Sequence, residues 1–286
     1  MNIVMSENEV RSMAGSYKVF EIERKEKFAW LFMNRPEKLN ACGPDFWREA
    51  LDVMEEIDQD DDVRVVILGG RGKAFTAGID LIGMAGEVTG LTEPGIMGRK
   101  RMKLVKDILK LQKSITAFEA CSKPVIAAIH GHCIGAGVDL ITACDIRLAS
   151  EDAAFSVREA RIAIVADVGT LQRLPRIVGE GFAKEMTYTT RDYTAKEARE
   201  MHLLNHVYPD KDALYAAAED LARQISDQSP LAVMAAKDVI HYCRDKSVDD
   251  GLTYVAQKSA NILPSQDLFE ALTAFGERRK PDFTGE

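Results

Sequence analysis

The sequence predicts an α/β fold in which buried strands and helices alternate and a helical region follows. Residues 63–68 and 125–129 are short apolar runs rich in β-branched or small side chains, typical of strands that are buried on both faces. A glycine-containing turn follows each run, and longer segments repeat apolar residues at steps of three to four, as amphipathic helices do. From about residue 195 onward helical patterns dominate. Right-handed strand–helix–strand crossovers then predict a core of stacked turns that is capped by helices.

Each element of the predicted core follows from a local pattern. The charged residues 23–27 separate two short apolar runs, which predicts a hairpin. Gly43-Pro44 precedes an amphipathic segment, and proline suits the first turn of a helix. The expected strands are 19–22, 28–33, 63–68, 125–129, 145–149 and 154–157, and the expected helices are 45–58, 98–120 and 136–143.

The C-terminal part of the chain predicts a series of helices, each bounded by Pro, Asp, Ser or charged residues. We place a boundary near Pro209, which divides the chain into a mobile N-terminus (1–16), an α/β core (17–209) and a helical C-terminal region (210–286). The expected helices in this part are 195–201, 211–226, 230–244, 248–262 and 265–279.

The composition is that of a folded globular protein, with 46% apolar and 29% charged residues among 286. The formal charge is -8, because 45 acidic residues outnumber 37 basic ones. A negative field of this kind opposes binding to nucleic acid, so an anionic ligand must be met by local positive charge. The composition therefore excludes a disordered or fibrous chain and gives no reason to expect a nucleic-acid partner.

Location, redox state and metal content are also constrained. No apolar run approaches the roughly 20 residues that span a bilayer, so we expect no membrane segment. The first 16 residues contain Glu7, Glu9 and a single base, Arg11, unlike a signal or transit peptide, which predicts a cytoplasmic protein. Five scattered cysteines without a Cys-x-x-Cys pair predict reduced core thiols. No carboxylate or thiol pattern completes a metal site around His130 and His132, and we assign neither histidine a role.

Two glycine-containing turns carry the first candidate chemistry. Residues 74–81 (AFTAGIDL) and 130–140 (HGHCIGAGVDL) follow the two buried strands. Glycine lets backbone N–H groups approach a ligand closely, and two such donors form an oxyanion hole for a developing negative oxygen. Turns between strands and helices also use glycine for structural reasons, so neither turn alone decides between the two interpretations.

These turns belong to a longer series of motifs. Residues 34–41 (NRPEKLNA), 74–81, 123–131 (KPVIAAIHG), 135–140 (GAGVDL) and 144–147 (CDIR) occur in this order. With them, residues 17–280 resemble the enoyl-CoA hydratase/isomerase (crotonase) superfamily. The resemblance implies a spiral of repeated β-β-α turns, a homotrimer or dimer of trimers assembled and capped by the C-terminal helices, and an acyl-CoA thioester substrate. It also implies that the backbone N–H groups of Ile79 and Ala136 hold the enolate oxygen.

Three acids at family positions indicate the reaction type. Asp139, Glu159 and Asp167 follow one another at intervals of 20 and 8 residues. Enoyl-CoA hydratases carry glutamates at the positions that match Asp139 and Glu159, and usually a small or apolar residue at the position of Asp167. An Asp, Glu, Asp set resembles the Δ3,5-Δ2,4-dienoyl-CoA isomerase branch. That resemblance implies that Glu159 removes a proton at C2, that Asp167 delivers one at C6, and that Asp139 adjusts polarity and ionisation.

Physical chemistry is consistent with this division of roles. Carboxylates crowded in an apolar pocket cannot all ionise cheaply, so at least one should stay protonated near neutral pH, and a neutral Asp167 could donate. Structural roles remain open for each acid. Asp139 could cap a helix, Glu159 could be a solvated loop residue, and Asp167 could be the N-cap before residues 168–170.

Coenzyme A carries phosphate groups, so basic residues should line its entrance even in an acidic protein. Arg278, Arg279 and Lys280 end the last expected helix, which in this superfamily often covers the cofactor of its own or a neighbouring subunit. Coenzyme A is part of the substrate, and we expect no resident cofactor. The candidates for CoA binding are Arg35, Lys38, Ala41, Lys73, Ala77, Asp80 and Leu81.

Two other functions remain open. A 2-enoyl-CoA hydratase would need Glu159 but not Asp167, so hydration of crotonyl-CoA discriminates it from an isomerase. An RNA-binding member of the superfamily would use the basic helix 98–120, although its apolar stripe favours an ordinary solvated face. Acyl-chain length depends on loops such as 82–100 and is not predicted. The basic residues of the helix are Arg99, Lys100, Arg101, Lys103, Lys106, Lys110 and Lys113.

Overall fold

The computed structural model describes residues 17–84 and 97–286. These residues form two β-sheets and the helices that surround them. The strands are β1 (Phe20–Lys25), β2 (Phe28–Met33), β3 (Val65–Gly70), β4 (Val125–Ile129), β5 (His132–Ile134), β6 (Ile146–Ser150), β7 (Ala154–Ser156), β8 (Tyr193–Thr194) and β9 (His206–Tyr208). Six strands form one sheet in the order β1-β2-β3-β4-β6-β9, in which β1 and β2 pair antiparallel and the other pairs are parallel. The smaller sheet has three strands in the order β5-β7-β8.

Helices connect these strands and dominate the C-terminal part. They are α2 (Pro44–Asp58), α4 (Met97–Ala120), α5 (Ala136–Ala143), α6 (Thr170–Thr189), α7 (Ala195–Glu200), α8 (Lys211–Ser226), α9 (Pro230–Tyr242), α10 (Val248–Ile262) and α11 (Gln266–Glu277). Short 3-10 turns are η1 (Pro36–Lys38), η2 (Glu159–Ile162) and η3 (Cys243–Asp245).

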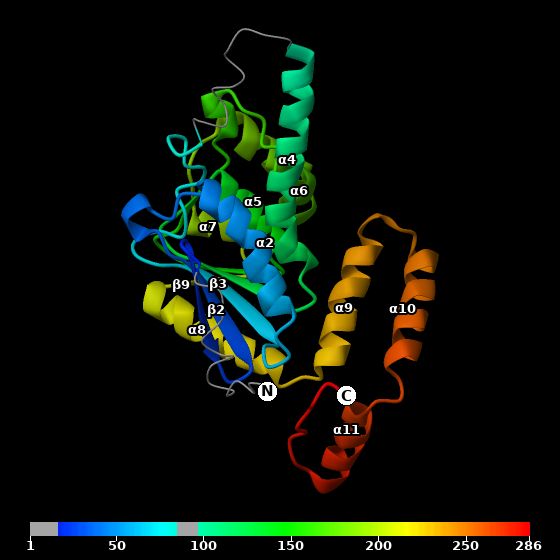
Figure 1. Cartoon of the computed structure of the whole chain (residues 1–286). Coiled ribbons are helices and arrows are strands. Elements are labelled where there is room, and N and C mark those ends of the chain that lie inside the picture. The colour runs from blue at the N-terminus through cyan, green and yellow to red at the C-terminus, as the bar shows by residue number, and fades with distance from the viewer. Residues whose placement is uncertain (1–16, 85–96) are drawn as a thin grey trace, which may run out of the picture.

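The large sheet is buried on both faces, as its continuous apolar strands predict. Along β2, Trp30 faces one side and Leu31 the other, because successive strand residues point to opposite faces. Trp30 pairs in register with Ile67 of β3, which pairs with Ile126 of β4, and α8 covers this face. On the opposite face α2, α4 and α5 pack over the strands (Figure 1). The carboxyl ends of the parallel strands therefore open on one common edge.

Most expected elements are confirmed within a few residues, and one large helix was missed. The twenty-residue helix α6 occupies a stretch for which the sequence patterns predicted no regular element. Pro175 and Gly179 lie inside it, and Gly179 has non-helical backbone angles (φ 79°, ψ 158°), so the helix is kinked there. Burial of residues such as Leu174 and Met186 holds the two halves together. The short strands β5, β8 and β9 were also missed.

The last three helices lie to one side of the sheet layers (Figure 1), and Lys237 ties α9 to them by donating to Lys123 O (2.9 Å) and Asp145 Oδ2 (2.8 Å). α9 and α10 pack side by side, with the rings of Tyr242 and Tyr254 stacked at a centroid distance of 3.9 Å. In contrast, α8 packs on the large sheet, so the sheet layers include residues beyond Pro209. The segment 1–16 lies outside the described residues, as does much of the loop 82–100. Four cysteines are buried thiols as expected, but Cys243 is exposed because η3 lies at the surface.

Candidate active site

The two glycine-containing turns meet at the carboxyl edge of the large sheet. A parallel bridge joins Thr76 and Cys133, and two backbone hydrogen bonds fix it: Thr76 N donates to His132 O (2.8 Å), and Ile134 N donates to Thr76 O (3.2 Å). The turns come together because β3 and β4, which precede them, are neighbouring parallel strands. Segments about 55 residues apart in the sequence thus form one surface.

Gly78 lets the two turns approach closely. Its φ is 88°, in the region that favours glycine, and a Cβ there would lie 2.6 Å from the carbonyl oxygen of Ile134 and 3.6 Å from the nitrogen of Ala136. Cys42 N donates to Gly78 O (2.7 Å), and Asp80 N donates to Cys42 O (3.0 Å), which leaves the N–H of Ile79 between these bonds. The turn therefore brings Gly78, the residue before Ile79, against the backbone that leads into Ala136.

Neither candidate donor is engaged by another group in the part of the chain that the structure describes. In residues 17–84 and 97–286, no hydrogen bond uses the N–H of Ile79 or that of Ala136. Ala136 is the first residue of α5, so its N–H has no intrahelical acceptor, and the positive end of the helix dipole lies at the same point. Two free N–H groups on adjacent turns form a site that can stabilise a negatively charged oxygen.

Asp139 lies one turn into α5 and is completely buried. Its Oδ1 accepts a hydrogen bond from the backbone N–H of Thr170 (2.6 Å), which places a carboxylate at the N-terminus of α6. Its Oδ2 is buried and has no hydrogen-bond partner in the described chain. Burial raises the pKa of Asp139 to about 6, despite the hydrogen bond from Thr170.

Glu159 begins η2 and faces the same space. A Cβ on Gly135 would lie 3.2 Å from Oε1 of Glu159, so the carboxyl group stands beside the turn that ends in Ala136. Its Oε2 is buried without a hydrogen-bond partner among the residues described. Burial raises the pKa of Glu159 to about 7, and the negative charge of Asp139 acts in the same direction. Glu159 is therefore not a solvated loop residue.

Asp167 completes the group of acids from the loop before α6. Its side chain is half-buried, and burial raises its pKa. The charge of Asp167 contributes to the raised pKa of both Asp139 and Glu159, which shows that the three carboxyl groups interact. The backbone carbonyl of Asp167 accepts a hydrogen bond from Gln112 Nε2 (2.7 Å), and Gly169 rather than Asp167 occupies the N-cap position of α6.

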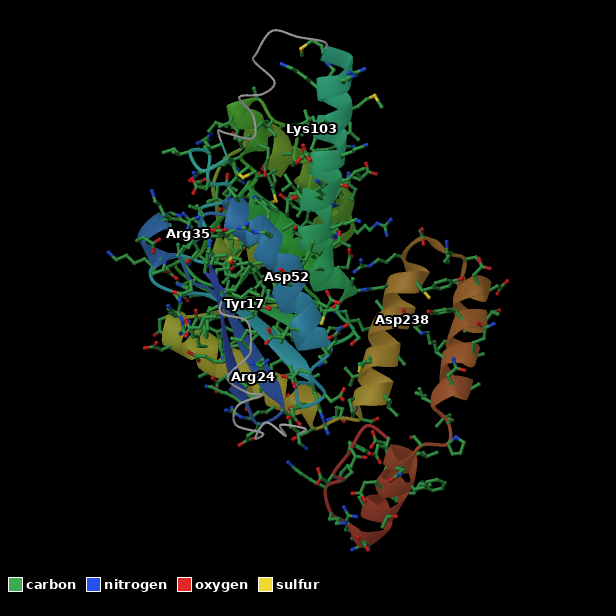
Figure 2. All side chains as sticks on the ribbon, viewed as in Figure 1. Tyr17, Arg24, Arg35, Asp52, Lys103 and Asp238 are labelled. Atoms are coloured by element: carbon green, nitrogen blue, oxygen red, sulfur yellow. The ribbon has the colours of Figure 1, made fainter. Side chains whose placement is uncertain are left out.

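The candidates for CoA binding surround the first turn. Arg35 donates to the carbonyl of Ala41 (3.1 Å) and pairs with Asp80 (3.3 Å), so its charge is partly neutralised. Lys38 and Lys73 are exposed and have no ion-pair partner within the described residues. Arg35 lies on the opposite side of the core from α9 (Figure 2). Ala77 is half-buried and donates to Leu39 O (2.9 Å), and Leu81 is 53% exposed.

The basic residues at the end of α11 lie away from the two turns, and His130 has a structural role. In the described chain no hydrogen bond or ion pair joins Arg278, Arg279 or Lys280 to the two turns, and Arg279 pairs with Glu270 and Glu277. His130 is buried against Gly72 O (3.1 Å), and burial lowers its pKa to about 4, so it is a neutral structural residue.

Sequence reasoning missed the residues that support the acids. Gln112, Thr170 and Arg173 contact or flank the segment of Asp167, and each comes from a helix whose packing was not predictable. One local signal existed: Asp167 is a residue type that often caps a helix N-terminus, and α6 does begin three residues later, although Gly169 occupies the cap position.

Comparison with known proteins identifies the chain. The family model described as enoyl-CoA hydratase/isomerase matches residues 23–286. The chain belongs to this family. A mitochondrial Δ(3,5)-Δ(2,4)-dienoyl-CoA isomerase of Dictyostelium discoideum is 45% identical over 269 residues, 93% of this chain and 92% of the relative. A peroxisomal enzyme of the same name from Arabidopsis thaliana is 46% identical over 271 residues, 94% and 98% of the two chains.

A solved structure supports the same assignment. The enoyl-CoA hydratase from Bacillus anthracis superposes with a TM-score of 0.85 at 32% identity, over 94% of this chain and 100% of that one. The crotonase-like fold expected from the sequence is therefore confirmed, and the chain lies in the dienoyl-CoA isomerase branch of the enoyl-CoA hydratase/isomerase family. Its relatives are named isomerases and hydratases, so the protein is an enzyme of this family.

The expected cytoplasmic location is wrong. The dienoyl-CoA isomerases it resembles are named as mitochondrial or peroxisomal enzymes. The prediction used the composition of residues 1–16, but targeting signals are read by receptors and leave no obligatory mark on a folded domain. A separate expectation concerned membranes: among the described helices none has the length and apolarity to cross a bilayer.

Proposed function

We propose that this enzyme converts 3,5-dienoyl-CoA to 2,4-dienoyl-CoA. A proton leaves C2 and another arrives at C6, so the double bonds at C3–C4 and C5–C6 move to C2–C3 and C4–C5 without a change in composition. The observation that carries the proposal is the placement of Glu159, with a buried unpaired oxygen, beside the turn that leads into Ala136 and within the influence of two further acids, Asp139 and Asp167. Relatives 45% and 46% identical are named for this reaction.

In the proposed mechanism Glu159 is the base at C2. Its pKa of about 7 leaves a substantial ionised fraction at neutral pH, and its unpaired Oε2 is available to take the proton. Asp167 is the acid at C6. Burial already raises its pKa, and an apolar acyl chain would displace more water from it and favour the protonated form further. Asp139 sets the polarity of the pocket and, through its charge, the ionisation of Glu159.

The dienolate oxygen is held by the N–H groups of Ile79 and Ala136 in this proposal. Loss of one such donor typically costs about 10²- to 10³-fold in kcat. The intermediate carries its charge from the thioester oxygen along the conjugated chain, so a base near the thioester and an acid deeper in the pocket can act on the same intermediate.

Exposed Lys38 and Lys73 are proposed to meet the phosphates of CoA. The ion pair between Arg35 and Asp80 is proposed to shape the entrance together with Ala41, Ala77 and Leu81, because it ties the first motif to the first turn. The reaction takes one proton from the substrate onto Glu159 and gives one from Asp167 to the substrate, so it requires no redox or metal cofactor. After product leaves, exchange with solvent removes the proton from Glu159 and returns one to Asp167, and CoA enters as part of the substrate.

We also propose that the C-terminal region 210–286 assembles a homotrimer or a dimer of trimers and caps the core. The large apolar side chains that α11 exposes to solvent support this, since apolar patches of that kind mark interaction surfaces. They are Leu268, Phe269, Leu272 and Phe275, with exposed fractions of 37, 59, 62 and 86%.

The decisive experiment follows the ultraviolet absorbance of the conjugated 2,4-dienoyl thioester after mixing the purified protein with a 3,5-dienoyl-CoA. Asp167→Asn should reduce kcat by about 10²- to 10⁴-fold, the usual contribution of a general acid, and leave thioester binding nearly unchanged. The matched control is Glu151→Gln, an exposed acid on the loop between β6 and β7, which should retain wild-type turnover. Wild-type turnover by Asp167→Asn would refute the role in proton delivery.

A 2-enoyl-CoA hydratase is the second candidate. The observation that favours it is the pair of buried unpaired oxygens on Asp139 and Glu159, which could hold a water molecule between them. Loss of 2-enoyl-CoA absorbance in a parallel sample, without formation of the conjugated diene, would establish hydration. That activity would survive Asp167→Asn and disappear with Glu159→Gln.

RNA binding ranks below both enzymatic functions, and we propose that the protein has no nucleic-acid partner. The side chain of Lys103 is exposed on α4, the long helix whose C-terminal half packs on the core (Figure 2). RNA affinity that falls with salt and is lost when Lys103, Lys106 and Lys110 become neutral would support the RNA-binding alternative.

A further inference from the structure

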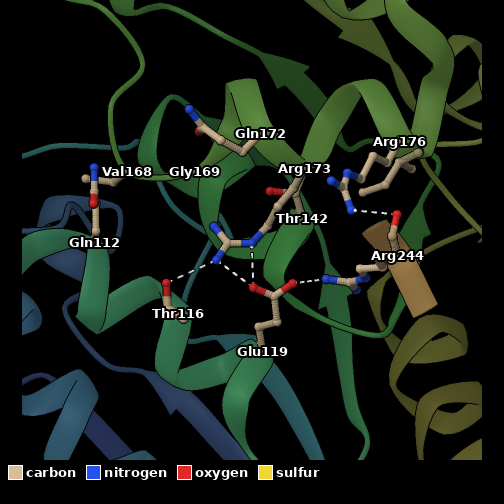
Figure 3. Close-up of a pocket in the computed structure, with 11 residues that line it drawn as sticks. Gln112, Thr116, Glu119, Thr142, Val168, Gly169, Gln172, Arg173, Arg176 and Arg244 are labelled. Atoms are coloured by element: carbon tan, nitrogen blue, oxygen red, sulfur yellow. Dashed lines mark hydrogen bonds and ion pairs between the residues drawn. The ribbon is translucent and has the colours of Figure 1, made fainter. Parts of the chain in front are cut away.

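Arg173, in the first turn of α6, is held by two residues of α4. Its Nε and Nη2 donate to Oε2 of Glu119 (2.9 and 2.7 Å), and Nη2 also donates to Oγ1 of Thr116 (3.1 Å; Figure 3). The two charged side chains are only 13% and 17% exposed, so solvent screens this pair less than a surface ion pair. Glu119 also pairs with Arg244 of η3, which fixes the carboxylate from a second side.

The guanidinium of Arg173 lies directly on the backbone of Gly169. Gly169 has a φ of 133°, and a Cβ at this position would overlap Nη1 of Arg173. Glycine is free to move in this region of φ and ψ, so the guanidinium supplies a constraint that the chain itself lacks. With its Nε and Nη2 held by Glu119 and Thr116, Arg173 thus packs Nη1 against the middle of the turn 167–170.

The turn 167–170 contains one of the acids, Asp167, and hydrogen-bonds to a second, Asp139. Asp167 is its first residue, and the N–H of Thr170, its last residue, donates to Oδ1 of Asp139 (2.6 Å). From the other side Gln112 of α4 donates to the carbonyl of Asp167 (2.7 Å). A displacement of the turn would therefore move Asp167 and release Asp139 together.

We propose that Arg173, anchored by Glu119, is a positioning residue that fixes the turn 167–170 and thereby places the carboxyl groups of Asp167 and Asp139. This inference rests on the proposed roles of the two acids. Arg173 touches no reacting atom in this scheme; it acts through the backbone of Gly169 and Thr170.

The charge of Arg173 makes a second contribution. It lowers the pKa of Asp139, against the effect of burial. Without it the pKa of Asp139 should rise, Asp139 should lose its charge near neutral pH, and the pKa of Glu159, which that charge raises, should fall. The charged and titratable groups that face this set are Cys42, Cys133, Glu159, Asp167 and Arg173 around Asp139, and Glu119, Cys144, Arg176 and Arg244 around Arg173.

The test compares Arg173→Ala with Arg176→Ala. Arg176 lines the same cavity but is exposed, and its side chain makes one hydrogen bond among the described residues, to the carbonyl of Arg244 (3.4 Å). Arg173→Ala should lower kcat for 3,5-dienoyl-CoA by about 10- to 100-fold with KM unchanged, because small misplacements of reacting groups cost this much. The ascending limb of the pH–kcat profile should move to lower pH. Arg176→Ala should match the wild type.

Chemical rescue sharpens this test. Arg173 borders a cavity of about 580 Å³, so truncation at this position leaves a space that added guanidinium ion can enter from solvent. Guanidinium at non-denaturing concentration should restore part of the turnover of Arg173→Ala and have no such effect on the wild type. If Arg173→Ala does not fold, Arg173→Lys replaces it: lysine keeps the charge but not the fork, and kcat should still fall.

A measurement without substrate separates this inference from the proposed function. Amide hydrogen exchange of residues 167–172 should accelerate in Arg173→Ala, while exchange in β6 stays unchanged. Inactivity of the wild type toward 3,5-dienoyl-CoA would refute the proposed function and leave the exchange result standing. Wild-type kcat in Arg173→Ala, an unshifted pH profile, or unchanged exchange in the turn would overturn the positioning role.

Discussion

Three interacting carboxyl groups give the site its chemistry at the scale of single residues. Burial raises the pKa of Asp139 to about 6 and that of Glu159 to about 7, from ordinary values of 3.8 and 4.5. The folded protein thus holds these protons more tightly than the unfolded chain does. Ionisation of either group lowers the free energy of unfolding. Carboxyl groups with this effect are expected at a site of proton transfer, where a base with a pKa near neutral pH is useful.

Glu159→Gln should stabilise the protein at alkaline pH. The pKa of Glu159 is raised in the folded state, so its contribution to stability is full below pH 4.5 and is lost as the pH rises through about 7. Urea unfolding at pH 8 should show a gain of about 1–3 kcal/mol over the wild type, discounted for partial exposure. Near pH 4.5 the gain should vanish. An equal gain at both pH values would contradict the assigned pKa.

The pH dependence of turnover should report the same group. kcat/KM for 3,5-dienoyl-CoA should rise as the pH increases through about 7, because Glu159 must be ionised to accept the proton from C2. Asp139→Asn removes the negative charge that raises this pKa, so the rising limb should move to lower pH. Steady-state rates from about pH 5 to about pH 9 check both points, and a limb at the same pH in the variant would refute the coupling.

At the scale of elements, α6 is a helix whose own sequence carries no clear helical pattern. Helical periodicity is interrupted by Pro175, which lacks an N–H, and by Gly179, whose φ and ψ are closed to other residues. The helix persists because its apolar face is buried and because Asp139 accepts the first N–H of its N-terminus. Both reasons lie in contacts with other elements, which local patterns do not contain.

Two glycines of α6 offer a matched test of this account. Gly179→Ala should destabilise the protein by about 1–3 kcal/mol, because alanine cannot adopt φ 79° and ψ 158° without strain. Gly181→Ala, two residues away in helical backbone with no atom within 4 Å of the added Cβ, should stabilise it by about 0.5–1 kcal/mol. Urea unfolding measures the change in the free energy of unfolding for each variant and shows whether the two changes have opposite signs. Equal effects would show that α6 continues smoothly through Gly179.

At the scale of the whole molecule, the C-terminal helices pose the question of assembly. They lie to one side of the sheet layers, which α9 contacts through Lys237 (Figure 1), and α11 leaves Phe275 86% exposed. An isolated chain with this surface would hold large apolar side chains in water, which oligomerisation would relieve. Formation of the proposed trimer would bury the apolar surface that the C-terminal helices expose.

A substitution on α11 tests the assembly. Phe275→Glu combined with Phe269→Glu should shift the protein from an oligomer to a monomer in light scattering coupled to size exclusion, because burying two unpaired charges opposes association. Tyr188→Glu, at a side chain that is 74% exposed on α6, is the control and should leave the mass unchanged. A monomeric wild type would refute the proposal directly.

Local patterns in the sequence by themselves determined much of this protein. The strands 28–33 and 125–129, the helices 136–143 and 211–226, and both glycine turns were correct from the sequence, because strand and helix periods and turn residues are short-range properties. Family membership followed from the order of the motifs, and comparison confirmed it. Asp139 lies in one of these motifs, and Glu159 and Asp167 were singled out by the family resemblance and by their spacing from it; the fold brings the three acids into one interacting group.

Only the tertiary structure decided how these parts act together. It placed Gly78 against the backbone of Ile134 and Ala136, left one oxygen of Asp139 and one of Glu159 without a partner among the described residues, and set Arg173 against Glu119, 54 residues away in the chain. Such contacts depend on which faces of distant elements pack together, whereas a sequence pattern reports the periodicity of one element at a time. The candidate site residues could therefore be identified from the sequence. Their protonation states and their positions relative to one another could be determined only from the folded structure.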